Sequence, residues 1–201
     1  VLYAKAKYAL AIDGNLPIIR EEKEVNLINA YHPLLLASNN KAKKKTYPQS
    51  INLNKETRII VISGPNAGGK SITLKTVGLL QVMLQSGMLI PVDPLSEVSF
   101  FKHILTDIGD NQSIENHLST YSYRLKRMNQ FLRRCDKSTL FLIDEFGTGS
   151  DPELGGALAE VFLEEFYERQ SYGIITTHYS NLKILASELP HAINANMLFD
   201  N

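Results

Sequence analysis

The stretch RIIVIS at residues 58–63, followed directly by GPNAGGKS at residues 64–71, decides the fold of this chain. The first part is a continuous apolar run, typical of a strand that is buried on both faces. The second fits the pattern G-x-x-x-x-G-K-[ST], whose glycines let successive backbone N–H groups turn toward phosphate oxygens. A helical pattern then runs from Lys70 to about Ser86. The order strand, loop, helix predicts a phosphate-binding loop, with the positive end of the helix dipole facing the anion.

The loop assigns separate roles to its last two polar side chains. Lys70 is expected to reach the β- and γ-phosphates of ATP, and the hydroxyl group of Ser71 is expected to hold Mg²⁺. The alternative is a glycine-rich turn with a chance Lys-Ser pair, which the flanking strand and helix disfavour. The predicted nucleotide ligands here are Gly64, Pro65, Asn66, Ala67, Gly68, Gly69, Lys70, Ser71 and Ile72.

Farther along the chain, TLFLID at residues 139–144 is a second continuous apolar strand that ends in two acids. Asp144 is expected to join the Mg²⁺ shell at the carboxyl end of the sheet, where ligands of open α/β sheets bind. Glu145 is expected to orient and polarise the attacking water. Two adjacent acids could also simply begin a solvated loop, but their place downstream of a phosphate loop favours the metal and catalytic roles.

Two further segments are candidate parts of the same site. The strand YGIITT at 172–177 is followed by His178, which could contact the γ-phosphate and help hold the water, or could be a structural histidine. The polar stretch DIGDNQSIENHLSTY at 107–121 precedes a long amphipathic helix that starts at Ser119 and ends near Arg134. Ser119 is a good N-cap, and a capped helix N-terminus can also bind an anion. Gln112 could couple the metal or the water to the rest of the protein.

The chain pattern as a whole predicts an α/β fold with a mostly parallel sheet flanked by helices. Residues 58–201 alternate strands with helices, adding a strand at 103–108, helices at 152–169 and 180–188, and a closing strand at 192–199. Residues 1–12 begin as an amphipathic helix, and residues 13–57 are expected to form an N-terminal antiparallel β portion, with strand-like alternation at 51–54. The basic run at 41–45 lies beside asparagines and Pro48, which predicts a solvated loop.

Composition limits the classes of function. The 201 residues carry 21 basic and 21 acidic side chains, so a dedicated nucleic-acid-binding domain, which is usually clearly basic, is disfavoured. The single cysteine, Cys135, indicates a reducing, cytoplasmic location. No apolar stretch approaches the ~20 residues of a membrane span, so no membrane partner is expected. The chain begins without Met inside a helical pattern, which suggests a piece of a longer protein.

The motifs in this order resemble the ABC class of P-loop NTPases, and their residues resemble the MutS family. The quoted similarities are GPNAGGKS, LSTYSY, IDEFGTGSDP and TTHY. The segments ITLKTVGLL, SGMLIPV and TTHYSNLK are similar to the second bacterial branch of the family, which is linked to recombination suppression and ribosome rescue instead of mismatch repair. Ala67 and Ile72, at positions where mismatch-repair members usually carry Met and Thr, also favour that branch.

The resemblance implies a homodimer in which each ATP lies between two subunits. Ser119 would then act in trans, assisted by Asn116 in trans, and residues 147–151 would communicate across the dimer. The family's His-Pro segment near the nucleotide corresponds to His32, and the position that packs on adenine corresponds to Leu198, where many relatives carry His. The N-terminal helix resembles the stump of a lever helix.

The function that follows is ATP binding and hydrolysis with Mg²⁺, driving a clamp on branched DNA or on stalled ribosomes through regions outside this chain. Catalysis is assigned to Glu145, His178 and Lys70, and the metal to Ser71, Asp144 and Gln112. DNA binding, DNA repair and nuclease activity would belong to those other regions. The alternatives are another ABC-class machine for DNA maintenance, and a nucleotide-dependent dimerisation switch with little turnover.

Overall fold

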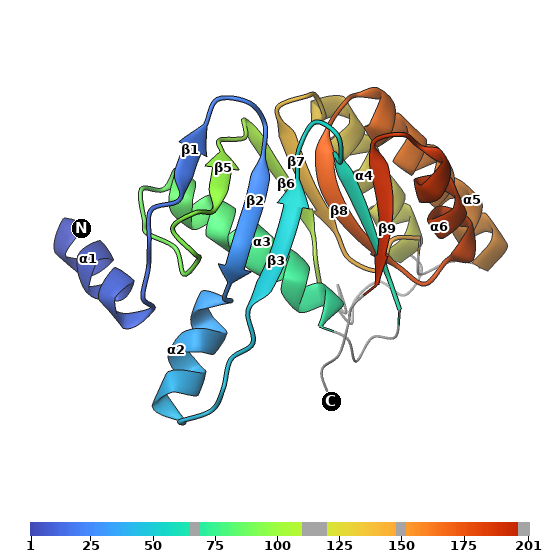
Figure 1. Ribbon diagram of the computed structural model, residues 1–201. Coiled ribbons are helices and arrows are strands. Elements are labelled where there is room, and N and C mark those ends of the chain that lie inside the picture. The colour runs from blue at the N-terminus through green and yellow to red at the C-terminus, as the bar shows by residue number, and fades with distance from the viewer. Residues whose placement is uncertain (65–68, 110–119, 148–151, 197–201) are drawn as a thin grey trace. The chain divides into compact units, whose positions relative to one another are not determined.

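The computed structural model describes residues 1–64, 69–109, 120–147 and 152–196 of the chain (Figure 1). Contacts between residues divide the chain into two compact units. Unit 1 contains Val1–Asn54 and Ile72–Phe100, and unit 2 contains Lys55–Ser71 and Phe101–Asn201. The predicted division of the chain after residues 12 and 57 stays a prediction.

Unit 2 is built around a five-stranded parallel sheet with the order β6-β7-β8-β4-β9. The prediction of a mostly parallel sheet flanked by helices is confirmed. In the central strands β4, β7 and β8 every side chain is buried, which explains their continuous apolar runs. The strands are β4 (Ile59–Ser63), β6 (His103–Asp107), β7 (Thr139–Ile143), β8 (Tyr172–Thr177) and β9 (Ala192–Asn196).

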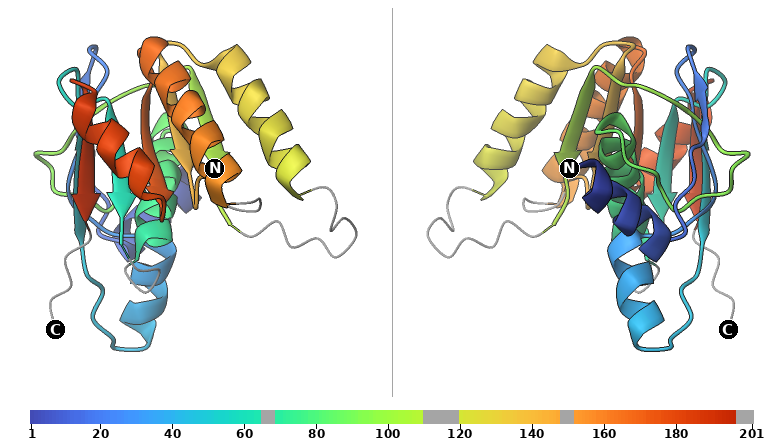
Figure 2. Two further views of the ribbon diagram at one scale, coloured as in Figure 1. Left: turned by 90° about the vertical axis from the view of Figure 1, so that its right-hand side faces the viewer. Right: turned by 90° about the vertical axis from the view of Figure 1, so that its left-hand side faces the viewer.

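Three helices of unit 2 lie on one face of this sheet: α4 (Thr120–Arg134), α5 (Pro152–Glu168) and α6 (Ser180–Glu188) (Figure 2). Alternate residues of the strands pack against them, because successive strand side chains point to opposite faces. Phe141 of β7 stacks on Phe166 of α5 with ring centroids 4.5 Å apart. These two rings belong to a hydrophobic core between the helices and the sheet, which also contains Val61, Ile143, Ile175, Met128, Leu163 and Leu182.

At Gly173 in β8, the strand backbone lies directly against the side chain of Phe141 in this core. Phe141 pairs directly with it across the strands, and a Cβ atom added at Gly173 would lie 2.3 Å from the Phe141 ring. The ring is fully buried and stacked on Phe166, so it has no space to withdraw.

Substituting Gly173 with alanine is therefore expected to destabilise the chain by about 1–3 kcal/mol or more, through overpacking. Urea unfolding followed by circular dichroism measures the change. The double variant Phe141→Leu with Gly173→Ala should recover part of the loss, because the smaller side chain vacates the space. Effects that simply add would show that the close approach is not the cause.

Unit 1 has a mixed four-stranded sheet with the order β1-β5-β2-β3. Strand β2 (Val25–Ala30) is antiparallel to β3 (Gln49–Leu53) and to β5 (Glu97–Ser99), which confirms the predicted antiparallel portion. Strand β1 (Ile18–Arg20) runs parallel to β5. Because β5 follows the phosphate loop in sequence, this sheet is completed by residues far from the N-terminus.

The helices of unit 1 are α1 (Leu2–Ala11), α2 (Pro33–Lys41) and most of α3 (Lys70–Gln85). Helix α1 is confirmed, although only Ala9 is buried and Leu2, Tyr3 and Leu10 are largely exposed. The solvated loop predicted at 41–45 begins later, because α2 continues to Lys41. Pro33 in the first turn favours that helix.

Among the helices that the structure describes, none combines the length and the apolar character that crossing a membrane requires.

Candidate nucleotide site

The backbone around the predicted phosphate loop has the form that the sequence pattern requires. Strand β4 ends at Ser63, and helix α3 begins at Lys70. Between them, Gly64 has a φ angle of 124° and Gly69 a φ angle of 74°. Positive φ values of this kind are accessible to glycine at little cost. The predicted ligands Pro65, Asn66, Ala67 and Gly68 lie outside the described residues.

Lys70 is almost completely buried, with 2% of its surface exposed. Its ammonium group donates a hydrogen bond to the carbonyl oxygen of Gly64. Burial lowers the pKa of Lys70, while the carboxylates of Asp144 and Glu145 oppose that shift. The structure therefore brings the loop lysine into the electrostatic field of both predicted acids, although more than 70 positions separate them in the sequence.

The two residues after Lys70 occupy the first turn of α3. Ser71 and Ile72 are half-buried, and the carbonyl oxygen of Ile72 accepts a hydrogen bond from the Thr76 hydroxyl group at 2.7 Å. Ser71 thus lies at the N-terminus of a long helix beside the loop.

The end of β4 is fixed to its neighbour by a residue that the sequence patterns did not single out. The hydroxyl group of Ser63 lies 2.7 Å from Oδ1 of Asn196 and 3.2 Å from Oδ1 of Asn194, both on β9. A serine before a glycine-rich loop and two asparagines in a closing strand carry no local pattern that would pair them. Only the strand order brings them together.

The acidic pair lies at the carboxyl end of β7, as predicted. Asp144 is 7% exposed, and its backbone N–H donates to the carbonyl oxygen of Asp107 at the end of β6, at 2.8 Å. Its Oδ1 accepts a hydrogen bond from the hydroxyl group of Thr176, at 2.5 Å. The backbone N–H of Glu145 donates to the same hydroxyl oxygen at 2.8 Å. The structure thus adds Thr176 to the site. Thr176 lies two positions before His178, the histidine that the sequence predicted.

His178 follows β8 directly, and its side chain is exposed. The next residue, Tyr179, donates from its hydroxyl group to the carbonyl oxygen of Gly147 at 3.1 Å, and its backbone N–H donates to Thr177 Oγ1 at 3.1 Å. These bonds hold the segment after β8 against the loop that follows the acidic pair. Because β8 lies between β4 and β7, His178 lies at the same edge of the sheet as the loop and the acids.

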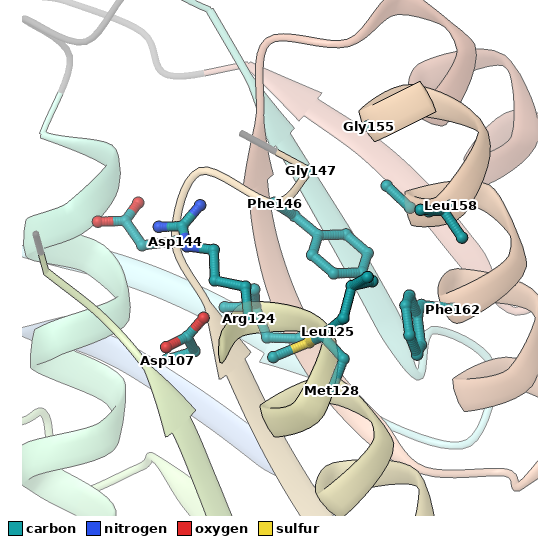
Figure 3. A pocket seen from close by; sticks show the side chains of 12 residues that line it. Asp107, Arg124, Leu125, Met128, Asp144, Phe146, Gly147, Gly155, Leu158 and Phe162 are labelled. Atoms are coloured by element: carbon teal, nitrogen blue, oxygen red, sulfur yellow. The ribbon is translucent and has the colours of Figure 1, made fainter. Parts of the chain in front are cut away.

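Two arginines of α4 contact the strand ends and were not predicted. Arg124 donates to the carbonyl oxygen of Glu145 at 3.2 Å, and Arg127 forms an ion pair with buried Asp107, whose Oδ1 lies 3.2 Å from its Nε. Figure 3 shows Arg124 reaching from α4 toward the strand ends that carry the two aspartates. Their spacing of three positions on an amphipathic helix is the sequence signal that could have identified them.

A small cavity of about 30 Å³ lies beneath these contacts, between α4 and α5 (Figure 3). Its volume suits a water molecule and not a nucleotide. Its lining is mostly apolar, from Leu125, Met128, Phe146, Leu158 and Phe162. The cavity therefore belongs to the packing behind the acidic pair.

Several predicted site residues have no described position. Gln112, Asn116, Ser119, Leu198 and the segment 148–151 lie outside the described residues. His32 is described in unit 1, where its Nδ1 accepts a hydrogen bond from the backbone N–H of Leu35 at 3.4 Å and caps α2. Burial, together with the nearby charge of Lys75, lowers the pKa of His32, which favours the neutral ring that this cap needs.

Two of the predicted metal ligands lie in the described part of the chain, and both are oxygen donors: the Ser71 hydroxyl group and the Asp144 carboxylate. Over the described parts of the chain, no group of three or more His, Cys, Asp or Glu side chains could form a metal cage. A sparse oxygen set fits Mg²⁺, which usually keeps several waters and is bound through one or two protein oxygens plus substrate phosphates. The donor chemistry thus fits Mg²⁺ held together with a nucleotide.

A glycine loop between a buried strand and a helix, with a buried lysine facing two acids at the end of a parallel sheet, defines the P-loop class of nucleotide-binding domains. The family described as MutS domain V, a P-loop ATPase domain, matches residues 60–201. The chain belongs to this family.

Known proteins that match nearly all of this chain agree with the family assignment. The chain is 47% identical over 199 residues to a protein of Finegoldia magna named "Endonuclease MutS2", covering 99% of this chain and 25% of the relative. A protein of the same name from Clostridium novyi is 44% identical over 199 residues, with the same coverage. One from Ligilactobacillus salivarius is 45% identical over 197 residues, covering 98% and 24%. The chain thus spans about a quarter of the length of these relatives.

Proposed function

We propose that this chain is the ATP-binding and ATP-hydrolysing module, of the ABC class, of a MutS2-like protein. The observation that carries the proposal is buried Lys70, bonded to the phosphate-loop carbonyl of Gly64 and within the field of Asp144 and Glu145. A buried ammonium group is stabilised by anionic oxygens, and a triphosphate supplies several of them. The family membership supports the same function.

In this proposal each residue has a separate task. The phosphate loop and Lys70 bind the phosphates, and Ser71 and Asp144 would hold Mg²⁺, which would neutralise phosphate charge when bound. Glu145 orients and polarises the water whose oxygen attacks the γ-phosphorus as the bond to the bridging oxygen of ADP breaks. His178, exposed at the same sheet edge, helps to hold that water. Catalysis then rests on positioning and electrostatics.

We further propose that the complete site needs two copies of the chain. The basis is the resemblance of residues 118–123 to the MutS signature. Ser119 and Asn116 would then contact the ATP of the partner subunit. On the same basis Gln112 is a metal or water contact, His32 and Leu198 are nucleotide contacts, and residues 147–151 communicate between subunits. The ATP cycle would open and close a clamp on branched DNA or stalled ribosomes in the cytoplasm. The nuclease activity that the relatives' name states is assigned to parts outside the matched quarter.

Phosphate release measured over a range of protein concentrations tests this function. Turnover per chain is expected to rise with concentration, because the site is completed by association. Ser119→Ala should lower turnover in the dimer by about 10-fold or more and leave ATP binding by the monomer unchanged. Turnover that is independent of concentration, with the same loss in monomeric protein, would contradict the role in trans. Binding of ATP without phosphate release would favour a dimerisation switch.

A further inference from the structure

One hydroxyl group connects the two acids of the site. Oγ1 of Thr176 donates to Oδ1 of Asp144 at 2.5 Å and accepts the backbone N–H of Glu145 at 2.8 Å. Thr176 is completely buried, and its own carbonyl oxygen accepts the N–H of Phe146 at 2.8 Å. A single residue of β8 therefore holds three consecutive residues of the segment after β7. We propose that Thr176 is a positioning residue for both carboxylates, an inference that rests on the proposed ATPase function.

The backbone of Glu145 shows why it needs such support. Its φ angle is 49°, in the left-handed region that costs a non-glycine residue on the order of 1 kcal/mol or more. The N–H of Glu145 is held by Thr176 and its carbonyl oxygen by Arg124, at 3.2 Å. Strained backbone of this kind persists where surrounding contacts determine it, and it directs the side chain. The Thr176 bond therefore helps to set the direction of the Glu145 carboxylate.

For Asp144 the same bond selects an orientation of the carboxylate. Oδ1 accepts a hydrogen bond from the Thr176 hydroxyl group, and Oδ2 carries further lone pairs that can bind a cation. The side chain is only 7% exposed, so water gives little alternative support. Loss of the bond would let the carboxylate rotate, and Mg²⁺ tolerates little departure from octahedral geometry.

The position of Thr176 in the sheet makes it suited to this task. Strand β8 pairs with β4, which leads into the phosphate loop, and with β7, which leads into the acidic pair. Thr176 lies opposite Ile62 of β4, one residue before the end of that strand. Strand β8 therefore sets the distance between β4 and the acidic pair, and Thr176 is the residue of β8 that contacts both acids.

The chain offers a closely matched control in Thr139, at the opposite end of β7. Thr139 is also completely buried, and its hydroxyl group donates to Oδ1 of Asp136 and accepts the N–H of Asp136, both at 3.0 Å. Valine at either position removes a buried hydroxyl group that joins a carboxylate to a backbone amide. The two substitutions should therefore cost similar stability, and only one of them touches the site.

The experiment compares wild type, Thr176→Val, Thr176→Ser and Thr139→Val. Backbone amide hydrogen exchange of Glu145, followed by NMR without nucleotide, is expected to accelerate at least about tenfold in Thr176→Val alone. The Mg²⁺ concentration for half-maximal binding of a non-hydrolysable β,γ-imido ATP analogue should rise severalfold, and kcat should fall by about 10- to 100-fold. Binding of the analogue without Mg²⁺ should stay unchanged. Thr176→Ser, which keeps the hydroxyl group, should restore all three quantities.

The possible outcomes separate this inference from the proposed function. Equal exchange, Mg²⁺ dependence and kcat in Thr176→Val and Thr139→Val, at equal stability, would show a structural bond only and overturn the inference. Failure of Thr176→Ser to restore the quantities would do so too, because the hydroxyl group would then not be the cause. A wild-type chain that binds Mg²⁺ and the analogue but releases no phosphate would overturn the ATPase function and with it this inference.

Discussion

Lys70→Ala is expected to weaken ATP binding by at least about 100-fold, which corresponds to ~2.7 kcal/mol. Two effects act in the same direction. The variant loses the charge-assisted hydrogen bonds between the ammonium group and phosphate oxygens, each worth about 1.5–3 kcal/mol. It also removes the cation that lies in the field of the Asp144 and Glu145 carboxylates. Without that positive charge, the two carboxylates repel the anionic phosphates. Isothermal titration calorimetry with ATP and Mg²⁺ measures the change.

A second substitution and a control make this result specific. Lys70→Met keeps most of the buried methylene chain and should lose binding as completely, which assigns the effect to charge. Lys75→Ala removes an exposed lysine from the same helix and should bind ATP as wild type does. Circular dichroism checks that the variants are folded. ATP affinity in Lys70→Met close to that of wild type would refute the assignment of the phosphate loop.

Glu145→Gln is expected to lower turnover by about 10²- to 10⁴-fold while ATP affinity stays within a few fold of wild type. Glutamine keeps the length of the side chain and leaves the two backbone bonds of residue 145, to Thr176 and Arg124, intact. It removes the negative charge that polarises the attacking water. Because a carboxylate beside the phosphates repels them, affinity should rise slightly if it changes. Single-turnover phosphate release and equilibrium binding separate the two effects.

Glu164→Gln is the matched control for this charge change. Glu164 lies on the exposed face of α5, and its substitution should leave both turnover and affinity unchanged. Near-normal turnover in Glu145→Gln would remove Glu145 from its role with the water. An equal loss of turnover in both variants would show that the effect comes from the net charge of the chain.

Much of unit 2 could be predicted from the sequence because its signals are local. Strands that are buried on both faces have continuous apolar runs, and β4, β7 and β8 lie within one residue of their predicted bounds. The glycine pattern before Lys70 indicates phosphate binding, and the two acids after β7 indicate contacts to a metal ion and to water. Each of these functions requires a particular residue type. Unit 1 was predicted less well: α2 continues through the asparagines that favoured a loop, since Pro33 and the His32 cap support it.

The sequence by itself determined that a phosphate loop opens a helix, that two acids end a buried strand and that the sheet is mostly parallel. Only the tertiary structure decided the order β6-β7-β8-β4-β9, and with it the neighbours of each strand end. That order places Thr176 against both acids and Ser63 against β9. In the other sheet, the order β1-β5-β2-β3 joins β5 to strands from the N-terminal part of the chain. The physical reason is that periodicity and composition report which faces of a segment are buried. Hydrogen bonds between strands far apart in the sequence choose the partners, and they leave no local pattern.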